Sequence, residues 1–159
     1  MISLISLLSF KRLFAYYFDN LSTEQRAAMD WVKENTPKSA KFVILTNRPD
    51  WGWSSDNTSE WFPALAERKS ITTPQGAEWI SGSFTQKANF YLETKACFNK
   101  DLACLQEVSK KYNEGFDYVY VQKTQDGSSS TSLLEHLLGH SKNFELIYNT
   151  KTAKVFQKI

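Results

Sequence analysis

Carboxylates and tryptophans gather in one stretch of the sequence, residues 47–82. The acids there are Asp50, Asp56, Glu60, Glu67 and Glu78, and the tryptophans are Trp51, Trp53, Trp61 and Trp79. A glycoside-processing site needs two carboxylates, one acting as acid and one as base, and the apolar faces of a sugar lie well on indole rings. These residue types are therefore compatible with a small glycan-acting hydrolase that uses Glu60 and Glu78.

The spacing of these acids does not show that any two of them meet. We favour a structural interpretation, in which buried indoles hold the loop and Arg68 pairs with Glu60 or Glu78 at its base. In that case this chain has no catalytic residue of its own.

Other common chemistries lack their sequence signals. The first predicted strand ends in Thr46-Asn47-Arg48-Pro49 and not in a glycine-rich turn, and no P-loop, G-x-S-x-G or H-E-x-x-H motif occurs. His136 and His140 are four residues apart, but no third ligand has suitable spacing. The net charge of +2 is too small for a surface that follows phosphates. We therefore expect no cofactor, no metal and no nucleic-acid partner.

Cys97 and Cys104 leave two alternatives open. Six residues separate them, without histidines at zinc-ligand spacing and without a C-x-x-C motif. The segment 98–101 reads as a turn in which Asp101 caps a second helix, so the sulfurs could meet at a corner between two helices. Either they form a disulfide, which would imply an oxidising compartment, or they are two buried thiols.

Periodicity and turn signals predict the elements that must position these residues. A helix begins with Ser22 as N-cap and Gln25 three residues later, and ends at Thr36-Pro37. The run 41–46 is short and almost continuously apolar, as in a strand covered on both faces of a parallel sheet. Residues 47–82 lack periodicity and are predicted to form a long functional loop.

The remaining elements complete an α/β pattern. Within the loop, a short helical turn is predicted at 59–68 and a strand at 70–73. Two helices follow between 83 and 112, with a break near Asn99, and then a strand at 116–122 and a helix at 131–138 that Gly139 ends. The last element is a hairpin of 144–148 and 153–156, whose second strand alternates inward and outward. The pattern predicts a single α/β domain over 21–159, with a small Rossmann-like three-layer sheet of parallel core strands and a C-terminal antiparallel hairpin.

The first twenty residues differ in composition from the rest. Thirteen of the residues 1–18 are apolar, but Lys11-Arg12 interrupts the run after ten residues, so a complete membrane span is not expected. The charge follows the apolar stretch and no small-residue cleavage pattern occurs, which argues against a secretory signal. Three alternatives remain: a helix in the membrane interface, the end of a transmembrane helix, or a helix packed on the domain. A separate hypothesis is a stand-alone interaction module that uses residues 1–18 to join a membrane or a partner.

A longer motif order points to a family. The run Ser59-Glu60-Trp61-Phe62-Pro63-Ala64-Leu65 is followed by Arg68, Ser70, Gln75-Gly76 and Glu78-Trp79. The segments 28–37 and 116–121 fit the same pattern. This order resembles the soluble C-terminal domain of bacterial polytopic membrane proteins related to GT-C glycosyltransferases, the dolichyl-phosphate-mannose-protein mannosyltransferase-like group.

The resemblance implies a function. Such enzymes transfer a sugar from a polyprenyl-phosphate donor, and their catalytic acid lies in the membrane portion. This chain would then be a non-catalytic domain on the extracytoplasmic side, with residues 1–18 as the end of the last membrane helix and with oxidised cysteines. Its partners would be the membrane portion of the parent enzyme or the lipid interface, and a glycan or protein acceptor. The binding surface would be formed by Glu60, Trp61, Arg68, Gln75, Glu78 and Trp79.

Overall fold

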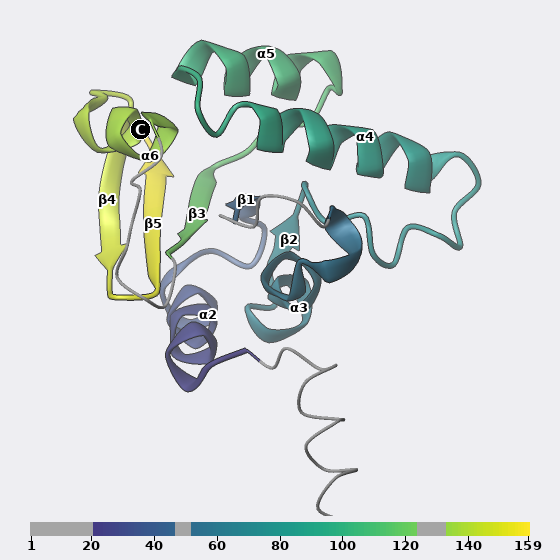
Figure 1. The fold of residues 1–159 in the computed structure, drawn as a ribbon. Helices are drawn as coiled ribbons and strands as arrows, with labels where there is room; N and C mark the ends of the chain where they lie inside the picture. Colours follow the sequence, from purple (N-terminus) through teal and green to yellow (C-terminus); the bar gives the residue numbers. More distant parts are fainter. Residues whose placement is uncertain (1–20, 47–51, 124–132) are drawn as a thin grey trace, which may run out of the picture.

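The computed structural model describes residues 21–46, 52–123 and 133–159 (Figure 1). This part of the chain has a mixed α/β fold built on one five-stranded sheet. Its elements are α2 (Thr23–Asn35), β1 (Lys41–Leu45), the 3-10 helix η1 (Trp53–Ser55), α3 (Asn57–Leu65), β2 (Lys69–Ser70), α4 (Ser83–Ala96), α5 (Leu102–Lys111), β3 (Tyr118–Gln122), α6 (Leu133–His140), β4 (Phe144–Asn149) and β5 (Ala153–Lys158). The helix expected within residues 1–20 lies outside the described residues.

The sheet has the strand order β2-β1-β3-β5-β4. β1 pairs in parallel with β2 and with β3, so that Val43 lies opposite Val119 in the centre. β5 is antiparallel to both β3 and β4. The predicted parallel core strands and C-terminal antiparallel hairpin are therefore confirmed. Because β2 and β3 lie on opposite sides of β1, the strand order reverses there, and the carboxyl ends of β1 and β3 border the point of reversal.

Helices cover both faces of this sheet. α2 and α3 pack on one face, and α4, α5 and α6 lie on the other (Figure 1). Successive residues of β1 and β3 alternate between the two resulting hydrophobic cores, which explains why both strands are almost continuously apolar. The strand residues in the first core are Phe42, Ile44, Tyr118, Tyr120, Ala153 and Val155, and those in the second are Val43, Leu45, Val119, Val121, Phe144 and Phe156.

Local capping signals begin two helices as the sequence predicts. Ser22 Oγ accepts a hydrogen bond from the Gln25 backbone N–H at 3.2 Å, and Gln25 Oε1 accepts one from the Ser22 N–H at 2.9 Å. Asp101 Oδ1 accepts from the Cys104 N–H at 3.0 Å at the start of α5. Each capping side chain satisfies a backbone donor that has no partner inside its helix.

Three details of the prediction need correction. α3 begins at Asn57, before the predicted turn, because Asp56 caps it. α6 continues through Gly139 to His140, since packing on the sheet outweighs the low helix propensity of glycine. β5 does not alternate simply between core and solvent: Val155 and Phe156 are both buried, in opposite cores.

The two edges of the sheet are short or irregular. β2 contributes two residues, Lys69 and Ser70. At the other edge the pairing of β4 with β5 shifts register between Leu146 and Tyr148. Within the described ranges, every helix is too short or too polar to cross a bilayer.

Candidate functional site

A buried carboxylate, Asp56, organises the carboxyl end of β1. Asp56 is 1% exposed, and its Oδ1 accepts a hydrogen bond from the Ser59 N–H at 3.0 Å, which caps α3. Its Oδ2 accepts from the hydroxyl of Thr46 at 2.5 Å and from that of Tyr91 at 2.9 Å. Asp56 thus joins β1, α3 and α4, and its oxygens are used by the fold. In the sequence, Asp56 is one acid among several. The signal for its role is its position three residues before Ser59, the spacing of an N-cap.

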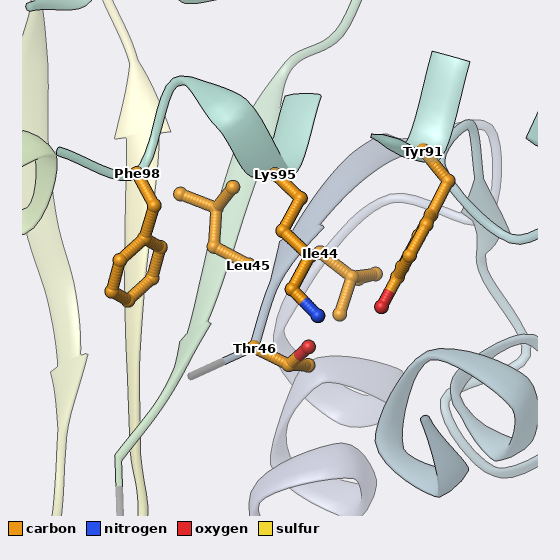
Figure 2. A pocket seen from close by; sticks show the side chains of 6 residues that line it. All are labelled: Ile44, Leu45, Thr46, Tyr91, Lys95 and Phe98. Carbon is orange, nitrogen blue, oxygen red and sulfur yellow. The ribbon is translucent and has the colours of Figure 1, made fainter. Parts of the chain in front are cut away.

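A small pocket lies next to this carboxylate, under α4 (Figure 2). Its cavity volume is about 10 Å³, enough for about one water molecule. Lys95 Nζ lies 5.7 Å from the centre of the Tyr91 ring, a cation–π distance. Figure 2 shows that the Lys95 ammonium and the Tyr91 and Thr46 hydroxyls point into the same space. The pocket is lined by Ile44, Leu45, Thr46, Tyr91, Lys95 and Phe98.

The size of this pocket limits its use. Pockets that enclose small-molecule ligands usually measure roughly 300 to 1,000 Å³. A pocket of about 10 Å³ cannot enclose a sugar ring. It is too small for a glycan.

A proline inside α3 explains the next group of contacts. Pro63 has no N–H, so the carbonyl of Ser59, four residues earlier, loses its usual helical partner. The hydroxyl of Thr73 donates to that carbonyl at 2.7 Å. In the same segment Thr72 Oγ1 accepts from the Ile44 N–H at 2.9 Å. The residues after β2 are therefore fastened to both α3 and β1.

Arg68 has a structural role that differs from the prediction. Its buried guanidinium donates to the carbonyls of Lys33 and Thr36, at 2.5 Å each, to the carbonyl of Glu67 at 3.0 Å and to Thr36 Oγ1 at 3.0 Å. The carbonyls at the end of α2 have no helical donors, so the arginine supplies them. The expected ion pair of Arg68 with Glu60 or Glu78 is wrong, and Arg68 is not part of an exposed binding surface.

Gln75 also holds the fold together. Its Nε2 donates to the carbonyl of Trp53 at 2.8 Å, which ties η1 to the segment after β2. The Trp53 ring packs edge-on against Phe84, with ring centres 4.9 Å apart. Gln75 Oε1 is buried without a hydrogen-bond partner in the described part of the chain. Gln75 therefore supports the neighbouring surface and is only partly accessible to a ligand.

The other four predicted site residues are exposed. Trp61, on α3, is 51% exposed, and Trp79, in the loop before α4, is 91% exposed. The expectation that these indoles are buried is wrong. Glu60 and Glu78 are also exposed. No hydrogen bond, ion pair or ring contact joins any of these four side chains to one another within residues 21–46, 52–123 and 133–159.

The loop that carries Trp79 is ordered by its own turns. The Ala77 N–H donates to the Pro74 carbonyl at 3.0 Å, the Ile80 N–H to the Ala77 carbonyl at 3.1 Å, and the Ser83 N–H to the Ile80 carbonyl at 3.0 Å. Gly82, at the N-cap of α4, has φ of 74°, a conformation that favours glycine. The backbone thus presents Trp79 outward in a defined position.

Cys97 and Cys104 form a disulfide that joins the end of α4 to α5. Cys97 is buried in the core under α4, α5 and α6. The sequence left open a disulfide or two buried thiols, and the structure contains the disulfide.

The histidines and the remaining acids do not form a metal centre in the described ranges. The exposed imidazoles of His136 and His140 stack with ring centres 4.2 Å apart, and His140 Nδ1 lies 2.8 Å from the His136 carbonyl. Asp50 and Trp51 lie outside the described residues.

Comparison of the sequence with models of known protein families gives no match, and comparison with curated proteins gives none. The site is therefore interpreted from its own geometry.

Proposed function

We propose that this chain is a non-catalytic, extracytoplasmic domain of a membrane glycosyltransferase that uses a polyprenyl-phosphate sugar donor. In this proposal the domain has a Rossmann-like fold. Its contact surface consists of Glu60 and Trp61 on α3 and of Glu78 and Trp79 in the loop before α4. This surface faces the acceptor or the membrane portion of the enzyme.

The exposure of two indoles on ordered segments is the observation that carries the proposal. Trp61 and Trp79 are 51% and 91% exposed, although large aromatic side chains usually bury most of their surface. Each lies on a backbone fixed by hydrogen bonds, α3 by the Asp56 cap and the loop by its turns. Exposed aromatic side chains at fixed positions are typical of contact surfaces.

Two further features support the location and the lack of catalysis. A disulfide is typical of proteins that fold in an oxidising compartment, such as the bacterial periplasm. Glu60 and Glu78 are exposed and form no ion pair with another described residue, which favours a contact role for them.

The reading frame upstream of Met1 provides the first test. We expect it to encode several hydrophobic spans in frame with this domain. A stop codon directly upstream, with no such spans, would contradict the proposal.

The second test measures sugar transfer by the parent enzyme. We expect the double variant Trp61→Ala, Trp79→Ala to lower transfer by about tenfold, equivalent to about 1.4 kcal/mol, because truncating exposed aromatic anchors removes contact area. The matched control is Leu92→Ala, an exposed apolar residue on α4. Thermal unfolding should be unchanged in both proteins. Undiminished transfer by the folded double variant would rule out this surface.

A further inference from the structure

Trp79 and Ile80 are two neighbouring, strongly exposed apolar residues. Their exposed fractions are 91% and 62%, and they are adjacent in the loop 74–82. From their exposure and setting, we propose that this pair inserts into the interfacial region of a lipid bilayer with a neutral or zwitterionic surface. The inference rests on the proposed function in one respect: a domain of a membrane enzyme has the bilayer within reach.

The size of the exposed pair favours lipid over a protein partner. A stable protein interface covers roughly 800 Å² on each partner. One indole offers roughly 150 to 250 Å², so an indole with a partly exposed isoleucine supplies well under that area. A bilayer interface needs no complementary surface around the tip, and tryptophan is enriched at the headgroup level because its ring is apolar and its N–H is polar.

The backbone of the loop suits insertion as a preformed tip. The three turn hydrogen bonds at Ala77, Ile80 and Ser83 satisfy backbone N–H groups inside the loop. Each backbone group that is already paired lowers the cost of moving the loop out of water. At the base, Gln75 fastens the loop to η1, so insertion requires no refolding.

The charge of the loop determines which lipid surface it fits. Glu78 is the one charged residue in the sequence 74–82. It is exposed and has no ion pair within the described residues. The nearest basic residue that follows it along the chain, Lys87, pairs with Glu114 at 2.9 Å. A tip with one unpaired negative charge is repelled by an anionic membrane and accepted by a zwitterionic one.

Tryptophan fluorescence can test this inference on the full chain. Residues 1–20 contain no tryptophan, so quenching by brominated lipid reports on the domain even when that segment binds the vesicle. We expect vesicles of acyl-brominated phosphatidylcholine to quench the wild-type protein. The variant Trp79→Phe keeps an apolar side chain at the tip and should lose most of this quenching. Trp61→Phe, the matched control on α3, should retain most of it.

Three results would overturn the inference. The first is no quenching of the wild-type protein, which would leave a soluble glycan or protein as the partner of the loop. The second is quenching that Trp79→Phe does not reduce, because then another tryptophan meets the lipid. The third is quenching that appears only when anionic lipid is added or that is abolished by salt, because an apolar tip next to Glu78 cannot give that dependence. Loss of sugar transfer in the Trp61, Trp79 double variant without any quenching would overturn this inference and leave the proposed function in place.

Discussion

At the scale of single residues, burial separates side chains that hold the fold from side chains that can meet a partner. Arg68 and Gln75 belong to the same sequence motif as Trp61 and Trp79, yet the first two donate to backbone carbonyls inside the protein. A motif can therefore combine a rigid base with the exposed groups that the base supports. Mutations in the two groups should have different effects.

Arg68→Ala should destabilise the domain strongly. The carbonyls of Lys33 and Thr36 would lose their donor, and each buried unpaired polar group costs about 1 to 3 kcal/mol, so we expect a total loss of about 3 kcal/mol in the free energy of unfolding. Arg68→Lys should lose part of this, because an ammonium cannot reach all the carbonyls at once. Urea unfolding measures the change, and Lys38→Ala, an exposed site, provides the control. A loss within about 0.5 kcal/mol for Arg68→Ala would contradict the capping role.

The pair Lys87–Glu114 should give a measurable pH dependence of stability. Burial by itself raises the pKa of the Glu114 carboxyl, but the hydrogen bond and charge of Lys87, together with the charges of Lys69 and Lys41, outweigh it, so the pKa lies below its ordinary value. A carboxyl with a lowered pKa in the folded state stabilises the fold above its unfolded pKa of about 4.3. This stabilisation is lost as the pH falls through the lowered folded value.

Lys87→Met should therefore cost about 1 kcal/mol of unfolding free energy at pH 7, and the cost should shrink as the pH falls below about 4. A smaller, pH-independent part should remain, because Lys87 Nζ also donates to the Ile71 carbonyl at 3.3 Å. Urea unfolding of the wild-type protein and the variant across this pH range measures the pH-dependent and the pH-independent part of the cost. Lys142→Met, at an exposed lysine, controls for the change in net charge. A cost that stays constant with pH would show that Glu114 does not depend on this lysine.

At the scale of secondary-structure elements, α3 shows how a helix-breaking residue is accommodated. Pro63 removes the donor for the Ser59 carbonyl, and Thr73 from outside the helix replaces it. The same hydroxyl therefore ties α3 to the segment that leads into the exposed loop.

Because the Thr73 hydroxyl takes the place of the N–H that Pro63 lacks, mutations at positions 63 and 73 should have coupled effects on the free energy of unfolding. Thr73→Val should cost about 1 to 2 kcal/mol in the wild-type background, since it leaves the Ser59 carbonyl unpaired. In the Pro63→Ala background the cost should be smaller, because the introduced alanine supplies a helical N–H to that carbonyl. A double-mutant cycle measured by thermal or urea unfolding gives the interaction directly. Additive effects would show that Thr73 stabilises α3 in another way.

The sequence predicted those elements that carry local signals. The capping box at Ser22 and Gln25, the Asp101 cap and the apolar runs at 41–46 and 116–122 each depend on neighbours in the chain, and the structure contains all of them. α3 was predicted less well, because its start depends on Asp56 and its contacts depend on Thr73, far outside the helix.

The candidate site was harder to predict than the fold for the same physical reason. Composition placed Trp61, Trp79, Glu60 and Glu78 in one functional stretch, but exposure is a property of the folded chain. Arg68 was expected to pair with an acid because charge is visible in the sequence. The backbone carbonyls that actually bind it carry no sequence signal.

At the scale of the whole molecule, the disulfide contributes to global stability through the unfolded chain. Cys97 and Cys104 close a short loop, with a sequence separation of 7. In the loop-entropy description such a closure stabilises a fold by about 2 to 3 kcal/mol. The variant Cys97→Ala, Cys104→Ala should therefore unfold at a lower urea concentration than the oxidised protein. The oxidised protein measured with a reductant should approach the variant, and no response to the reductant would show that the bridge adds little.

The two irregular edges have a consequence for how the molecule behaves at high concentration. A regular strand edge is a template for another strand, and long flat edges lead to fibrils. Here one edge strand has two residues and the opposite edge strand changes register in its middle, so neither offers a continuous ladder to a second chain. Copies of this domain that lie close together on a surface can therefore stay separate, because the sheet edge of one copy does not pair with that of the next.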